Sequence, residues 1–452
     1  MLGLLLAVAA VPSLIAGTAR SGPVDVAALL PDKPAAVAAC STVADPPTDA
    51  QGRIKVGDEV ALAAESPDYQ ALQAGMNLVW RQEIHHPGAS YIAPHFQRFN
   101  LPRGAAAVVR SPDNARLWTY TGQGKPRFGD REGFWGIHIP GDRAVIEVYS
   151  RHPVGKGAVR IDGYARGFGR QEQVAPSLGE PEAICGTDDS QRAQCYIGTD
   201  AYDKARTVAR LLINGTSACT GWLVGSEGHV MTNNHCIATA GDASNTDYEF
   251  MAEGSCSQNC ESWGACPGTV EASGGTLVKT NSALDYSLIK LPTNVSGTYG
   301  YLQMRNSGAV LDERIYIPQH AAAWGKRIAI ESTATVDGGF CHANDLNRPV
   351  CTGGTRDVGY MCDTRGGSSG SPVLGWDDNT VVALHHCANC PNRGVPIEHV
   401  IDHLGSSLPA DSTTGGSPPP PPTCSVKGDA CSADSECCDG KCRGKAGAKT
   451  CK

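Results

Sequence analysis

The cysteines constrain this chain more than any other residue type, because of both their number and their positions. The sequence has 19, of which twelve lie between residues 185 and 390 and six in the last 29 residues. Cysteines this dense are typical of an oxidising compartment, where they pair as disulfides. A piece of 29 residues cannot bury enough apolar surface to fold without such cross-links. The pattern predicts an exported protein with a disulfide-bonded central domain and a cross-linked tail.

The amino terminus also predicts export. Residues 1–11 are almost all apolar, Pro12 ends the run, and small residues lead to Ala19, although no Lys or Arg precedes the run. This order is typical of a signal peptide, so we expect residues 1–19 to be removed. The run is shorter than the roughly 20 apolar residues that span a membrane. We therefore expect a secreted, extracellular protein with no membrane association after signal removal.

Composition divides the rest of the chain into four segments. Residues 20–180 contain one cysteine and short apolar runs between turn residues, which is the pattern of a β-sandwich. Residues 181–410 contain the twelve cysteines and more strand-like runs, with a helical pattern only at 397–404, so the predicted fold class is all-β. Residues 411–423 include five consecutive prolines and form a linker, and residues 424–452 are the six-cysteine tail.

The charge balance argues against one class of partner. The chain has 38 Lys and Arg residues against 46 Asp and Glu residues, a net charge of −8. Proteins that bind nucleic acid through its backbone charge are basic. We therefore expect no nucleic-acid partner.

Three motifs in the central segment carry candidate chemistry. They are MTNNHC at 231–236, LDYSLIKL at 284–291 and GGSSGSP at 366–372. A serine hydroxyl is a weak nucleophile that needs a base within hydrogen-bond reach, and the base needs a carboxylate to fix its tautomer. The glycines beside the serine let the backbone turn, so that neighbouring amides can hold an oxyanion. The candidate catalytic residues are His235, Asp285 and Ser369, and the candidate oxyanion-hole amides are those of Gly367 and Ser369.

Over about residues 181–410, these motifs resemble the chymotrypsin-like (trypsin-like) serine proteases, and the nucleophile loop resembles the glutamyl and lysyl endopeptidase branches. The resemblance implies two six-stranded antiparallel β-barrels, protein or peptide substrates, and no metal or organic cofactor. It also implies that His235 is the base, that Asp285 orients it, and that Ser369 forms an acyl-enzyme.

One position departs from the digestive members of that family. Where they have an Asp that pairs with the new amino terminus on activation, this chain has Ser368. That ion-pair switch is unavailable here. We therefore expect a zymogen that is activated by removal of residues 20–180 as a pro-region. The alternative is that this segment is a retained binding module.

The resemblance leaves the primary specificity open. Asp363 matches the acidic pocket base of trypsin-type enzymes and favours cleavage after Lys or Arg. Thr364 and His385 match glutamyl endopeptidases and favour cleavage after Glu, although the lysyl branch also has a His near that position. A third option is that Asp363 is hydrogen-bonded within its loop and the pocket is undiscriminating. We expect cleavage after Lys or Arg, with Glu as the alternative.

The resemblance also implies disulfides. Cys219–Cys236 matches the bridge beside the catalytic His, and a Cys362–Cys387 bridge would frame the pocket. The other expected pairs, of which the first two follow the lysyl branch, are Cys185 with Cys390, Cys195 with the 256–260 loop, and Cys341 with Cys351. Zinc on Cys256, Cys260 and Cys266 is a less favoured alternative, because no His follows at a zinc spacing.

The spacing of the tail resembles inhibitor cystine-knot (knottin) modules. That resemblance implies the pairs Cys424–Cys438, Cys431–Cys442 and Cys437–Cys451. The tail is locally basic, which is compatible with attachment to a polysaccharide or cell surface and equally with a solvated stability module.

Two other functions remain as alternatives. One is a catalytically inactive homologue that acts as a secreted binding protein. The other is an esterase with the same triad, but the esterase fold places its nucleophile first in chain order and here Ser369 comes last.

Overall fold

The structure is a computed structural model. It describes residues 48–70, 75–125, 133–169, 172, 184–334, 336–351, 356–415, 442–445 and 448–451. The chain divides into two units, residues 1–42 and 43–452, and every described residue belongs to the second. The predicted signal peptide at 1–19 lies outside the described residues.

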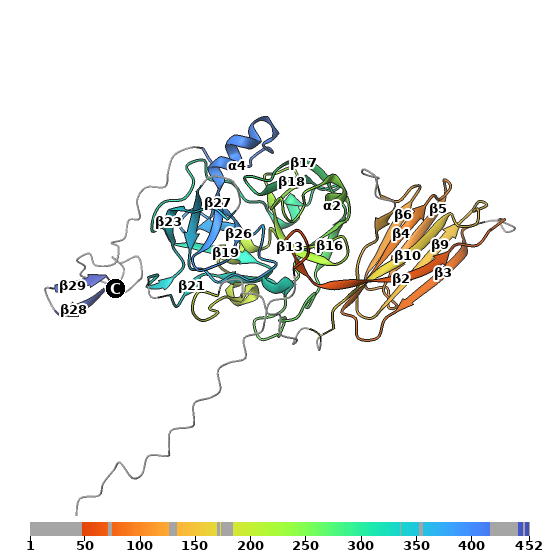
Figure 1. Cartoon of the computed structure of the whole chain (residues 1–452), viewed down its shortest axis with the longest axis horizontal. Coiled ribbons are helices and arrows are strands. Elements are labelled where there is room, and N and C mark those ends of the chain that lie inside the picture. Colours follow the sequence, from red (N-terminus) through yellow and green to blue (C-terminus); the bar gives the residue numbers. More distant parts are fainter. Residues whose placement is uncertain are drawn as a thin grey trace, which may run out of the picture. The chain divides into compact units, whose positions relative to one another are not determined.

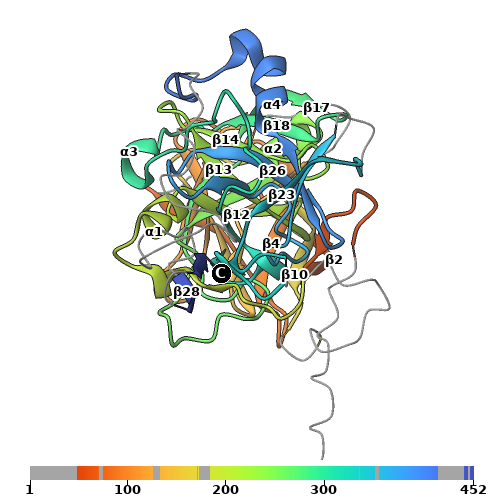
Figure 2. The ribbon, with the colours of Figure 1, turned by 90° about the vertical axis from the view of Figure 1, so that its left-hand side faces the viewer.

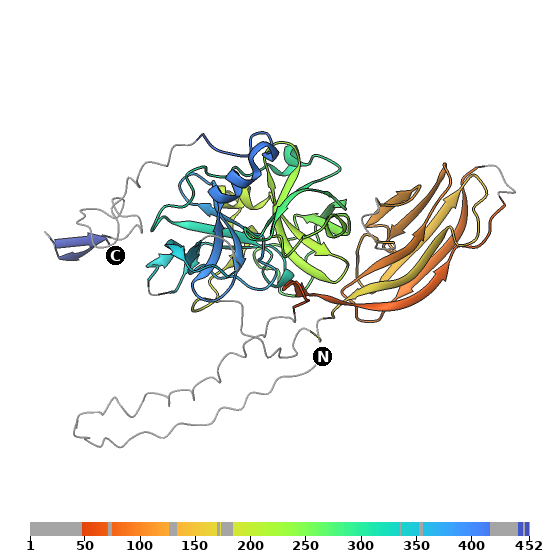
Figure 3. The same cartoon turned by 45° about the horizontal axis from the view of Figure 1, so that its top comes forward.

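Two antiparallel sheets form the β-sandwich expected in the amino-terminal segment (Figures 1 and 3). The first is ordered β2 (Gly57–Glu65), β10 (Val159–Gly167), β4 (Tyr91–Phe99) and β7 (Phe134–Trp135), with β8 (Ile139–Pro140) also on β4. The second is ordered β3 (Asn77–His85), β9 (Arg143–Ser150), β5 (Ala105–Arg110) and β6 (Leu117–Thr121). Alternate residues of β2 and β5 are more buried, which is the period-two pattern of strands with one face on a core.

Two curled sheets form the central domain, so the predicted all-β fold with antiparallel barrels is confirmed. Each sheet has eight strands where the resemblance implied six. The first is ordered β16 (Thr269–Ser273), β15 (Thr246–Phe250), β12 (Val208–Ile213), β13 (Ser217–Val224), β14 (His229–Thr232), β18 (Tyr286–Lys290) and β17 (Thr276–Asn281), with β1 (Ile54–Lys55) on β13. The second is ordered β11 (Gln191–Arg192), β20 (Arg327–Ala329), β19 (Ile315–Gln319), β25 (Pro372–Gly375), β26 (Val381–Cys387), β27 (Asn392–Pro396), β24 (Asp357–Tyr360) and β23 (Ala343–Arg348).

Helices are few and short. They are α1 (Asp200–Ala205), α2 (Ala240–Ser244), α3 (Ser296–Tyr299) and α4 (Ile397–Leu404), with 3₁₀ turns η3 (Ala193–Tyr196), η4 (Ala321–Ala323) and η5 (Gly405–Ser407). The helix expected at 397–404 is confirmed as α4, which lies beside β17 and β18 in Figure 2. The Lys279 ammonium of β17 donates to the His403 carbonyl at 2.6 Å, so α4 ties the first sheet to the second.

Two short hairpins complete the strands: β21 (Glu331–Ser332) with β22 (Gly339–Phe340), and β28 (Cys442–Lys445) with β29 (Ala448–Cys451). In the tail hairpin, Cys442 lies opposite Cys451. The three predicted knottin pairings involve Cys424, Cys431, Cys437 and Cys438, which lie outside the described residues, so they stay predictions. No helix within the described part of the chain is both long and apolar enough to cross a membrane.

Five disulfides join described residues, and they settle the pairing within the central segment. Cys219–Cys236 and Cys185–Cys390 are confirmed, and Cys195 joins Cys256 as expected. Cys260 pairs with Cys266, so these cysteines are not a zinc set.

The predicted bridges Cys362–Cys387 and Cys341–Cys351 are wrong. Cys351 pairs with Cys387 instead. Cys341 and Cys362 are free thiols that are buried in the core of the second sheet, and Cys341 Sγ donates to the Glu331 carbonyl at 3.5 Å. Burial raises the pKa of both thiols. The spacing of cysteines along the chain does not reveal these pairings. Cys351 and Cys362 lie on either side of β24, and their side chains have different neighbours.

The strand β1, which precedes the sandwich, joins the first barrel sheet. Ile54 lies opposite Ala218 and Lys55 opposite Ser217 in antiparallel register. Ile54 is buried in a mixed apolar cluster that also contains Ala323 of η4 and Trp135 of the sandwich.

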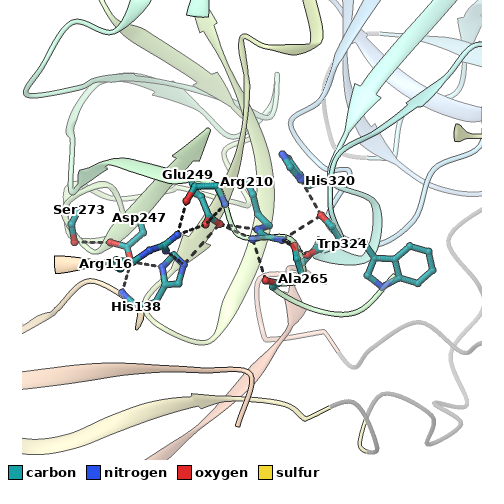
Figure 4. A network of polar contacts seen from close by, with 12 residues as sticks. Arg116, His138, Arg210, Asp247, Glu249, Ala265, Ser273, His320 and Trp324 are labelled. Atoms are coloured by element: carbon teal, nitrogen blue, oxygen red, sulfur yellow. Dashed lines mark hydrogen bonds and ion pairs between the residues drawn. The ribbon is translucent and has the colours of Figure 1, made fainter. Parts of the chain in front are cut away.

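A buried polar network also joins the sandwich to the barrel (Figure 4). Arg116 donates to Glu249 Oε1 at 2.9 Å and to the Gly268 carbonyl at 2.6 Å. His138 lies 2.7 Å from Asp247 Oδ2 through Nδ1. Glu249 also accepts from Arg210 at 2.7 Å. Buried charges are tolerated only when they are paired, so these contacts fix how the two β-structures meet.

Replacing Arg116 with Ala should therefore destabilise the protein. The change removes the sandwich's cation from Glu249 and leaves the His138 ring without its Arg contact at 2.9 Å. Breaking a buried ion pair costs about 3–5 kcal/mol, and because Glu249 keeps Arg210 we expect about 2–3 kcal/mol in the free energy of unfolding. Urea unfolding of the Ser369→Ala chain, which avoids self-digestion, measures it.

The matched control is Arg143→Ala, on the same sandwich. Arg143 pairs with Glu83 where both side chains are more than two-fifths exposed, so its loss should cost under about 1 kcal/mol. Equal losses for the two variants would show that the network does not hold the interface.

Candidate active site

The predicted base and carboxylate lie against each other in the first barrel. His235 follows β14 and Asp285 precedes β18, and these two strands are neighbours in the sheet. His235 Nδ1 lies 2.7 Å from Asp285 Oδ2, and the His235 amide donates to Asp285 Oδ1 at 2.9 Å. Asn233 donates to the Asp285 carbonyl at 2.8 Å, which pins a turn where Asp285 has a φ of +42°.

Burial separates the roles of these two side chains. The Asp285 side chain is 3% exposed and that of His235 is 23% exposed, so only the imidazole reaches solvent. Burial opposes ionisation of Asp285, but His235 and His386 outweigh it and hold the pKa of this carboxyl well below its usual range. Asp285 is therefore an anion at neutral pH that fixes which His235 nitrogen faces outward.

Ser369 lies beside the His235 segment. Its carbonyl accepts the Thr220 amide at 2.9 Å and lies 3.8 Å from Cys236 Sγ, next to His235 in the chain. The Cys219–Cys236 disulfide joins β13 to this segment. The structure thus places the backbone of Ser369 next to the segment that carries His235, which contacts Asp285, and Ser369 is partly exposed there.

The loop before Ser369 presents two backbone amides without acceptors. The amides of Ser368, Gly370 and Ser371 each donate to a backbone carbonyl. Within the described residues, the amides of Gly367 and Ser369 donate to no protein acceptor. Preorganised donors of this kind stabilise an oxyanion because they need no rearrangement during reaction.

Ser368 itself holds this loop in shape. Its hydroxyl accepts the Arg365 amide at 3.1 Å, and its carbonyl accepts the Ser371 hydroxyl at 2.6 Å. Local hydrogen bonds of Ser368 therefore hold the nucleophile loop in shape. Ser368 occupies the position where the digestive proteases have the Asp of the ion-pair switch.

Both carboxylate oxygens of Asp363 accept hydrogen bonds from backbone amides. Its Oδ1 accepts the Cys185 amide at 2.8 Å and its Oδ2 accepts the Asp189 amide at 2.7 Å. Burial, the largest effect, raises the pKa of Asp363 to about 7. Asp363 thus ties the start of the central domain to the loop before Ser369, through amides that lie outside its own loop.

The other two pocket candidates are buried and uncharged. Thr364 Oγ1 has no hydrogen-bond partner among the described residues. His385 Nδ1 lies 2.7 Å from the Tyr360 hydroxyl, and burial lowers the pKa of this imidazole to about 3. Thr364 therefore has unused hydrogen-bonding capacity, and His385 is a neutral ring at neutral pH.

Sequence reasoning missed two residues at this site. The His386 ring lies between the Asp285 carboxylate and that of Asp357, at 3.3 Å and 3.1 Å. The available signal was the pair of adjacent histidines at 385–386, because neighbouring residues of a strand point to opposite faces.

Comparison with known proteins agrees with this geometry. Residues 219–384 match the model of the trypsin-like peptidase domain, and this range contains His235, Asp285 and Ser369. The chain is 43% identical over 342 residues to the secreted RxLR effector protein 73 of Plasmopara viticola, covering 72% of this chain and 82% of that protein. That alignment is longer than the whole segment 181–410 and so extends beyond the barrels.

Solved structures show more distant likeness. A Glu endopeptidase has 17% identity and a TM-score of 0.34, covering 50% of this chain and all of that one. The HtrA-type protease AlgW has 13% identity and a TM-score of 0.34, covering 46% of this chain and 61% of that one. This chain thus spans about three-fifths of the AlgW chain.

Replacing Gly367 with Ala should slow attack by Ser369. Gly367 has a φ of +90°, and a Cβ there would stand 2.9 Å from both the His320 carbonyl oxygen and Ile54 Cδ1. The loop must shift and misdirect the Gly367 amide, and loss of one oxyanion donor costs about 10²- to 10³-fold in rate. The measurement is the rate of the initial burst of nitrophenolate from a p-nitrophenyl ester, which reports the attack by Ser369.

Gly297→Ala in α3 is the control, because that glycine is exposed and no atom lies within 4 Å of the added Cβ. If Gly367→Ala reacts as fast as this control, the Gly367 amide is not an oxyanion donor.

Proposed function

Because this chain belongs to the family of the secreted RxLR effector protein 73 and contains a trypsin-like peptidase domain, we propose that it is a secreted serine endopeptidase. The observation that carries the proposal is the buried Asp285 carboxylate bonded to His235 beside a loop with two unoccupied amides. The name of the relative supports export of this chain as well.

The proposed reaction follows from these positions. Ser369 Oγ attacks the peptide carbonyl, and His235 Nε2 takes the hydroxyl proton while Asp285 stabilises the imidazolium. The amides of Gly367 and Ser369 hold the oxyanion. His235 then returns the proton to the leaving amine, and an acyl-enzyme on Ser369 remains. Water, deprotonated by His235, releases the carboxylic acid and restores the serine.

We propose cleavage after an acidic residue. Both oxygens of Asp363 already accept backbone amides, so the carboxylate has little capacity left for Lys or Arg. Burial raises the pKa of Tyr360 well above its usual value, so its hydroxyl keeps its proton and shares a hydrogen bond with His385 Nδ1. Thr364 Oγ1, which has no hydrogen-bond partner among the described residues, is a donor suited to a substrate carboxylate, and the neutral His385 ring on β26 is the second candidate.

We also propose that the amino-terminal segment restrains the site until it is removed. Arg53 donates to the carbonyl of Cys236 at 3.2 Å, next to the base, and Ile54 reaches the loop of Gly367. The oxyanion loop is already formed, so we propose that the restraint is steric. The strand β1 pairs with β13, next to the segment of Cys236 and the loop of Gly367.

Peptide-library cleavage tests the activity and its specificity. The secreted protein should cut after Glu, and Ser369→Ala should fold normally and cut nothing. Cuts after Lys or Arg would contradict the acidic pocket. A folded and processed protein that cuts no peptide would favour the alternative of a secreted binding protein.

Thr364→Val should lower kcat/KM for a Glu substrate by about 10- to 100-fold, because a hydrogen bond to a charged group is worth about 1.5–3 kcal/mol. The shape of the side chain is kept, so the p-nitrophenyl ester, which does not use the pocket, should react at the wild-type rate. Equal loss on both substrates would mean that Thr364 supports the loop and does not bind substrate.

Ile54→Asp should raise ester hydrolysis by the intact, unprocessed chain. Ile54 is 1% exposed, and a buried carboxylate without a partner is costly, so β1 should leave β13. Leu78→Asp, at a residue that is 51% exposed on β3, is the control. An intact wild-type chain that is as active as the processed enzyme would refute the restraint.

A further inference from the structure

His386 contacts the candidate triad through Asp285. It lies on β26, and its side chain is 1% exposed. Its Nδ1 is 3.3 Å from Asp285 Oδ2, the same oxygen that lies 2.7 Å from His235 Nδ1. One carboxylate oxygen is thus flanked by two imidazoles.

Asp357 holds the other end of this ring. It begins β24 and is 2% exposed, and its Oδ2 lies 3.1 Å from His386 Nε2. Both ring nitrogens of His386 therefore face a carboxylate oxygen. The Nε2 contact with Asp357 is a hydrogen bond, whereas Nδ1 has no hydrogen-bond partner among the described residues and meets Asp285 as an ion-pair contact. Two carboxylates against one buried ring favour its protonated form.

The charges around the ring favour that protonated form. Burial opposes it, but Asp285 and Asp357 outweigh burial and raise the pKa of His386 to about 9. The other titratable groups that face the cluster are His235 after β14 and His385 on the same strand. The adjacent Cys351–Cys387 disulfide does not titrate.

From this geometry we infer that His386, held by Asp357, is a positioning residue: it fixes Asp285 Oδ2 toward His235 and supplies a buried cation that keeps Asp285 ionised. The role is separate from the chemistry, because both ring nitrogens of His386 already lie against protein carboxylates. The inference rests on the proposed peptidase activity.

The cation has a second consequence for the base. A positive charge behind Asp285 repels the imidazolium that His235 becomes when it takes up the serine proton. Asp357 lies farther from His235 and partly offsets this effect. Removing His386 alone and removing Asp357 alone should therefore act in opposite directions.

The test is the pH profile of kcat/KM in the full chain. His386→Gln keeps amide donors and acceptors but loses the charge. The acid limb, which is the fall of kcat/KM at low pH, should therefore move to a pH about one unit higher than in the wild type, and at pH values below it kcat/KM should be lower than in the wild type. Asp357→Asn should leave the limb in place or move it down. The double variant should return toward the wild-type limb, because the two removed charges have opposite signs. His399→Gln, on α4, is the control and should not move the limb.

An acid limb that moves to higher pH in His386→Gln and partly returns in the double variant supports the inference. A limb that stays in place in both single variants, or a double variant that is worse than either, shows a structural role only. If the wild type hydrolyses nothing, the proposed function fails instead.

If His386→Gln does not fold, histidine-labelled Ser369→Ala protein provides the second measurement. By NMR, the His386 ring should stay protonated up to about pH 9. A ring that is neutral at pH 7 would overturn the inference.

Discussion

The buried carboxylate of Asp285 is the group on which the candidate site depends. A carboxylate with almost no exposed surface survives as an anion only when donors and cations surround it. This one has the His235 amide, the His235 ring and the His386 ring on its two oxygens. Those contacts fix the turn before β18, the direction of the His235 ring and, through the Cys219–Cys236 disulfide, the segment beside Ser369.

The same physical rule governs the junction between the sandwich and the barrel. Asp247 and Glu249 of β15 are both buried, and each has a partner that comes from the sandwich, His138 and Arg116. When an interface built partly on charges separates, part of the surface that it exposes to water is polar. The removal that we propose for the amino-terminal segment needs that property, and Ile54 adds apolar contacts at the same junction.

Much of this was predictable because it depends on local pattern. Strand periodicity predicts the all-β fold, and the motif order predicts that His235, Asp285 and Ser369 meet. The disulfides of Cys362 and Cys341 were predicted wrongly because side-chain direction, not spacing, decides pairing across β24 and β26. The environment of Asp363 depends on amides almost 180 residues away in the chain, at Cys185 and Asp189, which spacing does not reveal. His386 escaped notice because its partners, Asp285 and Asp357, come from two other strands.

Reaction of the secreted protein with a fluorophosphonate, followed by peptide mass mapping, measures directly whether Ser369 is an activated nucleophile. We expect one adduct per chain, on Ser369, that His235→Ala abolishes and Asp285→Asn slows by about 10⁴-fold. An adduct on another residue, or a folded and processed chain that forms none, would contradict it.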